Sequence, residues 1–172
     1  MATNCLAMHA VSVELTSLPI FDQLYRQYSE TVYRTARRIT GNPTDAEDVL
    51  QTVFLRVLSR PEIGLGVQSA EAYFRRAATN ASIDVLRRRT TRSETPLDGI
   101  GPQPVQESSP LLKERLRRAI AGLDPEDAEI FLLKYLEGWS SLELARQFGI
   151  ERGTVGSRLF RIRQVLQRVF ER

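Results

Sequence analysis

The 172 residues are long enough for one ordinary domain or two small ones. No apolar run approaches the roughly 20 residues of a membrane-spanning helix, and the single cysteine, Cys5, excludes an internal disulfide framework and fits a reducing cytoplasm. The net charge is only +3, yet its distribution is uneven.

The N-terminal third predicts two helices behind a short leader. Residues 1–18 are mildly apolar and lack the Lys or Arg of a secretion signal, so we expect a disordered leader. Apolar residues at helical spacing between Phe21 and Ile39 predict an amphipathic helix. Thr44 with Glu47 matches a capping box, which predicts that a second helix begins there.

A loop and a third helix follow. The segment 61–68 contains Gly64 and Gly66 and predicts a loop. A third helix is expected from about Ala70 to Arg89, and its small apolar residues imply close packing against its neighbours.

Residues 93–109 are rich in proline, glycine and serine, and they predict a flexible linker. Fully extended, 17 such residues reach about 55–60 Å, so the two halves of the chain could lie far apart. No segment alternates with period two, and we therefore expect an all-α protein of two small helical domains. The predicted organisation is a leader at 1–18, domains at 19–92 and 110–172, and the linker between them.

The last fifty residues predict a helix-turn-helix. Asp124 followed by Pro125 signals the start of a preceding helix. Ser140 with Glu143 forms a capping box, and Gly149 stands where a tight turn favours positive φ. The next helix carries one apolar stripe and an arginine-rich opposite side, an arrangement suited to a DNA major groove.

Charges cluster along the chain in two basic and two acidic groups. Six arginines lie between Arg75 and Arg92 against Asp84 alone, and seven follow Ser141. Acidic groups lie at residues 45–48 and 124–129. Because phosphate attracts only basic surfaces, this pattern indicates two nucleic-acid contacts and a separate protein contact.

Several motifs in fixed order carry a family resemblance. They read DAEDVLQTVFLRVL, then YFRRAATNASIDVLRRR, and after the linker LDPEDAEIFLLKYLEGWSSLELARQFGIERGTVGSRLFRIR. Together they resemble the extracytoplasmic-function (ECF, group IV) sigma factors of the sigma-70 family, over nearly everything from Phe21 to Phe170. The resemblance implies two domains, called regions 2 and 4, that bind core RNA polymerase and direct transcription initiation at promoters.

Residue roles are carried over by matching motif positions. Docking on the β′ clamp helices of core polymerase is expected of Asp45, Glu47, Asp48, Gln51 and Phe54. Recognition and opening of the −10 promoter element are expected of the loop 61–68 and of Tyr73, Arg75, Arg76, Asn80, Arg87, Arg88 and Arg89. Recognition of the −35 element is expected of Arg152, Thr154, Ser157, Arg158 and Arg161.

Some of these residues have an alternative, purely structural interpretation. For Asp45, a solvated acidic helix start favoured by the helix dipole is as reasonable as docking. Phe74 lies on the apolar stripe and is expected in the core, which makes Tyr73 the better candidate for an exposed aromatic. Trp139 is expected to pack in front of the helix-turn-helix rather than to contact a base.

Three positions depart from the family pattern. Gly156 stands where Lys or Arg is common, Glu151 replaces a serine-like helix cap, and Thr79 replaces a frequent arginine. These departures affect promoter specificity and strength, and they leave the domain assignment unchanged.

The sequence bears on three classes of function. The first is the sigma factor, with core polymerase (β′ clamp helices and β flap), promoter DNA and an anti-sigma factor as partners. The second is a stand-alone helix-turn-helix regulator, which would need neither the acidic docking helix nor the basic aromatic helix. A nuclease or recombinase is disfavoured because His9, the only histidine, and Cys5 make no credible metal set. We therefore expect a cytoplasmic protein without catalytic residues, metal, cofactor or membrane insertion.

Overall fold

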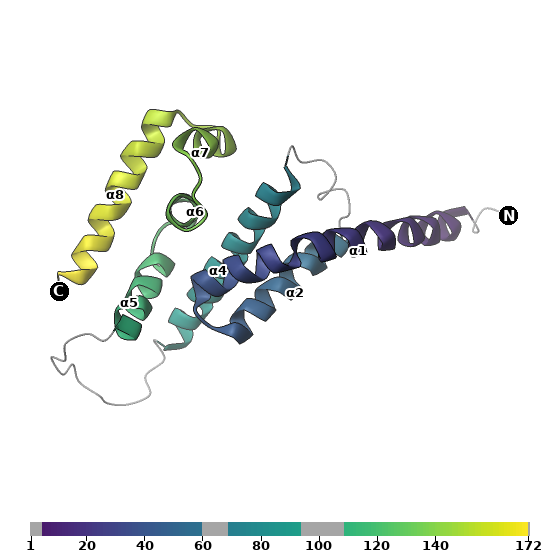
Figure 1. Cartoon of the computed structure of the whole chain (residues 1–172), viewed down its shortest axis with the longest axis horizontal. Helices are drawn as coiled ribbons and strands as arrows, with labels where there is room; N and C mark the ends of the chain where they lie inside the picture. The colour runs from purple at the N-terminus through teal and green to yellow at the C-terminus, as the bar shows by residue number, and fades with distance from the viewer. Residues whose placement is uncertain (1–4, 60–68, 94–108, 172) are drawn as a thin grey trace.

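The computed structural model describes residues 5–59, 69–93 and 109–171, and this part of the chain is all-α, as predicted. Seven helices and no strand occur among these residues (Figure 1). The helices are α1 (Cys5–Thr40), α2 (Pro43–Ser59), α4 (Ala70–Ser93), α5 (Ser109–Ala121), α6 (Pro125–Tyr135), α7 (Ser141–Phe148) and α8 (Arg152–Phe170). We call α1, α2 and α4 the N-terminal bundle, and α5 to α8 the C-terminal bundle. The predicted loop at 61–68 lies outside the described residues, as does 94–108 of the predicted linker.

The N-terminal bundle is built around a row of aromatic rings. The Phe74 ring is stacked between those of Tyr28 and Phe54, with centroid separations of 4.7 and 5.2 Å. Phe74 is fully buried, which confirms its predicted place in the core. Ala78 and Ala81 of α4 are also buried, and their small side chains let α4 approach α1 and α2 closely.

The start of α1 differs from the expectation for the leader. The helix begins at Cys5, within the segment 1–18 for which we expected disorder. Pro19 lies inside this helix, where it removes one backbone donor.

The predicted capping box at Thr44 is wrong, as the turn between α1 and α2 shows. Asn42 caps α2 instead, because its Oδ1 accepts hydrogen bonds from the backbone N–H groups of Thr44 (2.8 Å) and Asp45 (3.5 Å). Pro43 is then the first helical residue, where its missing N–H and fixed φ are favourable. Gly41 precedes the cap with φ +73°, a backbone conformation that glycine adopts without strain.

The predicted caps of the C-terminal bundle are confirmed. The Asp124 side chain accepts from the Glu126 N–H at 3.0 Å, with Pro125 opening α6. Ser140 and Glu143 form both bonds of a capping box, at 2.7 and 3.1 Å. Gly149 ends α7 in the left-handed region at φ +63°. Glu151 precedes α8 without a side-chain cap bond, as expected of a poorer cap.

The two bundles share an apolar cluster. Ile39 of α1 and Ile83 and Leu86 of α4 are buried in the same cluster as Ile120 and Leu133 of the C-terminal bundle. Helix α4 packs against α1 and α2 on one side and against α5 and α6 on the other (Figure 1). The linker is long enough for the two halves to lie far apart, but in this structure they are packed together.

Candidate nucleic-acid and protein interfaces

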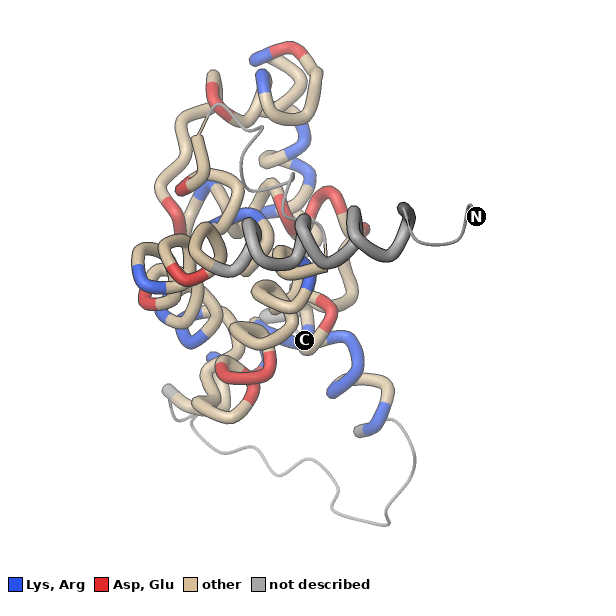
Figure 2. Tube along the Cα trace, turned by 90° about the vertical axis from the view of Figure 1, so that its right-hand side faces the viewer, with Lys and Arg blue, Asp and Glu red and all other residues tan. Residues whose placement is uncertain are grey.

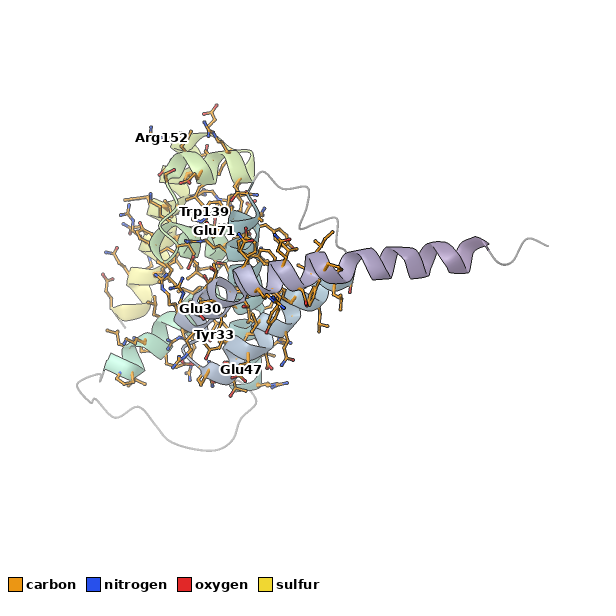
Figure 3. All side chains as sticks on the ribbon, turned by 45° about the vertical axis from the view of Figure 1, so that its right-hand side comes forward. Glu30, Tyr33, Glu47, Glu71, Trp139 and Arg152 are labelled. Carbon is orange, nitrogen blue, oxygen red and sulfur yellow. The ribbon has the colours of Figure 1, made fainter. Side chains whose placement is uncertain are left out.

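The predicted docking residues on α2 divide into an exposed and a buried group. Glu47, Asp48 and Gln51 are exposed, and Figure 3 shows Glu47 at the lower edge of the N-terminal bundle. Phe54 is only 3% exposed and belongs to the aromatic core, so in this structure it packs α2 against the rest of the bundle. Asp45 also points inward and accepts a hydrogen bond at Oδ2 from Arg89 Nη1 at 3.1 Å.

Two apolar residues that sequence reasoning missed extend this surface. Leu55 and Leu58 are 60% and 43% exposed. Leu55 lies four residues after Gln51, and Leu58 three residues after Leu55, so all three share one side of α2. The signal was present in the sequence, because both leucines lie off the buried stripe of Ala46, Val49, Val53 and Val57. We call Glu47, Asp48, Gln51, Leu55 and Leu58 the α2 docking face.

Four arginines predicted to bind DNA, Arg75, Arg76, Arg87 and Arg89, are occupied by other groups, and we call them the α4 arginine set. Arg76 Nε donates to Glu129 Oε1, and its guanidinium lies 5.1 Å from the centroid of the Phe148 ring. Arg75 Nη1 donates to Glu137 Oε2 at 3.3 Å. Both acceptors belong to the C-terminal bundle.

The other two members of the set also contact the C-terminal bundle. Arg87 donates from Nε to the Ala121 carbonyl (3.3 Å) and from Nη2 to the Leu123 carbonyl (3.0 Å), at the end of α5. Besides Asp45, Arg89 reaches Glu114 Oε1 with Nη2 at 3.4 Å. Arg88 differs, because it is exposed and donates only to the Asp84 carbonyl one turn earlier on α4.

Tyr73 and Asn80 lie in open clefts where the bundles meet. Tyr73 is partly buried, with its ring edge-on to Phe74 at 5.3 Å. Burial raises the pKa of its phenol against the opposing charge of Arg56. It lines one cleft with Glu71 and Trp139, which lie near each other in Figure 3. Asn80 lines a second cleft beside Arg76, Arg87 and Glu129.

Trp139 packs in front of the helix-turn-helix as predicted. It is partly buried against the apolar cluster, and its backbone N–H donates to the Leu133 carbonyl at 3.0 Å. Its carbonyl accepts from Lys134 Nζ at 3.2 Å. These contacts fix the turn that leads from α6 into α7.

On α8, four of the five predicted DNA-reading residues point into solvent. Val155, Leu159, Ile162 and Leu166 bury one side of the helix. Figure 3 places Arg152 at the opposite end of the view from Glu47. The exposed predicted residues are Arg152, Thr154, Ser157 and Arg161.

Arg158 is the exception on α8, because it is bound to α6. Its side chain is 17% exposed, with Nε 2.8 Å from Asp127 Oδ1 and Nη1 2.6 Å from Glu126 Oε2. Burial lowers the pKa of this guanidinium, but the two carboxylates raise it by more. Arg158 therefore joins α8 to α6 in this structure, and base reading by it stays a prediction.

Acidic and basic residues are interspersed across the molecule rather than separated onto two sides (Figure 2). Within the described residues, no group of three or more His, Cys, Asp or Glu side chains could hold a metal. No helix in the described ranges has the length and apolarity to cross a membrane.

Comparison with known families matches both bundles. Residues 24–92 match the family described as Sigma-70 region 2, and residues 113–166 match Sigma-70, region 4. The two matches fall on the N-terminal and C-terminal bundles respectively.

Two curated relatives and one solved structure extend this similarity. The chain is 34% identical over 160 residues to the ECF RNA polymerase sigma factor SigE of Mycolicibacterium smegmatis, covering 88% of this chain but only 62% of that protein. It is 34% identical over 142 residues to the ECF RNA polymerase sigma factor SigL of Mycobacterium tuberculosis, covering 79% and 80%. The fold is similar to sigma factor RpoE, solved with the anti-sigma factor NepR from Bartonella quintana (TM-score 0.52, 21% identity, 88% and 96% covered).

Proposed function

Because the chain belongs to the ECF family of RNA polymerase sigma factors, we propose that it binds core RNA polymerase and directs transcription initiation at promoters. The observation that carries the proposal is the match of both bundles to sigma regions 2 and 4, with an exposed arginine-bearing side on α8, the second helix of the helix-turn-helix. Its relatives are sigma factors, which favours this function over a stand-alone regulator. The finer placement is group IV, with region 2 at 19–92 and region 4 at 110–172.

The α2 docking face is proposed to bind the β′ clamp helices of polymerase. Its acidic end offers carboxylates that a basic partner surface can pair with, and Leu55 and Leu58 offer apolar surface that a partner can bury. Asp45 and Phe54, which do not lie on this face, are proposed to hold α2 in position. Region 4 is proposed to contact the β flap, so that polymerase holds both bundles at once.

Promoter DNA is proposed to contact both bundles. The α4 arginine set, with Tyr73, Asn80 and Arg88, is assigned to the −10 element and the adjacent duplex, where arginines hold phosphates and exposed bases are stacked or hydrogen-bonded. The exposed side of α8 is assigned to the −35 element in a major groove. Phosphodiester chemistry stays with polymerase, and this chain contributes no catalytic group.

An anti-sigma factor is the proposed regulator, as is usual for this family, and the structural relative RpoE was solved in such a complex. Because core polymerase acts in the bacterial cytoplasm, we place the protein there. No cofactor or metal is part of the proposal.

Run-off transcription with core polymerase, this protein and a library of randomised promoters tests the proposed function. We expect transcripts enriched in a bipartite promoter motif, because two DNA-reading bundles impose two separated elements. If the protein did not bind core polymerase, that result would contradict the proposal and favour the stand-alone regulator. Tight sequence-specific binding by the free chain would contradict it as well.

The docking face is tested by the double substitution D48R/Q51A. Reversing one charge and removing one amide on an exposed helix face should weaken core-polymerase binding by at least about tenfold. The matched control is Q27A/E30R, which makes the same changes on an exposed side of α1 with the same spacing. Binding is measured by titrating labelled protein with core polymerase, and equal affinity of both variants would remove Asp48 and Gln51 from the interface.

A further inference from the structure

The α4 arginine set is bound by acidic and carbonyl oxygens of the C-terminal bundle. Arg76 pairs with Glu129, Arg75 with Glu137, and Arg89 with Glu114. Arg87 is held by two carbonyls at the end of α5. Every member of the set therefore has an oxygen partner from the other bundle.

Two of these acids are buried, so their contacts are not incidental surface pairs. The Glu137 side chain is 2% exposed and the Glu129 side chain 8%. A carboxylate removed from water is strongly unfavourable unless cations and hydrogen-bond donors compensate it. For Glu137, this compensation comes from Arg75 and from Arg38 of α1, both in the N-terminal bundle. These acids therefore need the arginines while the bundles are closed.

The same arginines are suited to phosphate. The guanidinium presents its donors in a planar fork that matches the oxygens of carboxylates and phosphates alike. The set runs along α4 from Arg75 to Arg89, a rise of about 21 Å at ~1.5 Å per residue. A nucleic-acid backbone lying along this length would require the oxygens of Glu129 and Glu137 to leave.

We propose that the α4 arginine set is one surface with two alternative occupants: the carboxylates of the C-terminal bundle in the free protein, and the phosphates of DNA after the bundles separate. This inference rests on the proposed function, because that function assigns DNA to α4. The exposed side of α8 is not covered when the two bundles are packed together, which we call the closed arrangement. Only the α4 surface assigned to the −10 element is then blocked from binding DNA.

The test is the binding of fluorescein-labelled oligo(dT) to the free full-length chain, measured by anisotropy at fixed salt. In the variant E129Q/E137Q, the neutral amides release the arginines, and we expect affinity to rise by about tenfold or more. The control E30Q/E171Q also removes two negative charges, but at exposed sites, and its affinity for oligo(dT) should stay within about twofold of wild type. Equal affinity of variant and control would overturn the inference.

A measurement on the unaltered protein guards against a variant that fails to fold. Small-angle X-ray scattering of the free wild-type chain should fit the closed arrangement of the two bundles. A profile that requires separated bundles would overturn the inference.

Run-off transcription with E129Q/E137Q separates this inference from the proposed function. Wild-type initiation without a gain in oligo(dT) affinity would overturn the shared surface and leave the proposed function standing. A gain in oligo(dT) affinity without initiation by either protein would support the covered anion-binding surface while the proposed function fails.

Discussion

Arg158 and Arg161 lie three residues apart on α8 but have different surroundings. Arg158 is bound by Glu126 and Asp127, whereas Arg161 is exposed and has no ion pair among the described residues. Hydrogen bonds that involve charged groups contribute more to stability than neutral ones, and a partly buried guanidinium holding two carboxylates ties α8 to α6. The two arginines should therefore respond differently to substitution.

Replacing Arg158 with alanine should lower the free energy of unfolding by about 1–3 kcal/mol, because two charge-assisted contacts between α6 and α8 are lost. Replacing Arg161 should leave stability within about 0.5 kcal/mol of wild type, as at other exposed sites, and weaken promoter binding by the holoenzyme. Urea denaturation measures the first effect and a promoter-binding titration the second. Unchanged stability in R158A would show that the ion pairs contribute nothing.

Helix starts show which local signals can be trusted. The caps at Asp124 and Ser140 were predictable because each bond joins residues two or three positions apart. At α2, the pattern from Thr44 to Glu47 matched a capping box, but Asn42 before Pro43 gives an earlier start. A proline is especially favourable at the first helical position, which makes the Asn-Pro pair the stronger start signal.

The capping box of α7 should make stability depend on pH. Hydrogen bonds with Ser140 hold the pKa of the Glu143 carboxyl below its ordinary value. The bond with the Ser140 side chain has the larger effect, and the bond with its backbone the smaller. Because the folded pKa is the lower one, the stabilisation is complete above the ordinary carboxyl pKa and is lost as pH falls through the folded value.

We therefore expect the difference in Tm between wild type and E143Q to be largest at neutral pH and to shrink under acid. Thermal melts from neutral pH downward measure this, with E171Q, an exposed substitution at the end of α8, as the control. A difference that stays constant with pH would show that the ionised carboxylate is not the stabilising form.

The overall helical plan could be predicted from periodicity, but the arrangement of the two bundles could not. Arg76 and Glu129 are 53 residues apart, and Arg38 and Glu137 are 99 apart. No local pattern links such residues, so Arg76 was assigned to DNA, Glu129 to an acidic protein-contact group, and Arg38 and Glu137 were given no role. For the same reason, the ion pairs of Arg158 with α6 were not predicted, although Arg158 does lie on the second helix of the helix-turn-helix, as expected.

The apolar cluster that crosses between the bundles affects how the protein can be dissected. Ile39, Ile83 and Leu86 are covered by residues of the C-terminal bundle. A fragment that ends after α4 would carry these three side chains bare to water, beside arginines that had lost their counter-charges. Contiguous exposed apolar surface promotes self-association. Fragments cut between α4 and α5 would therefore aggregate more readily than the intact chain, and point substitutions in the intact chain are the sounder route to separating the roles of its halves.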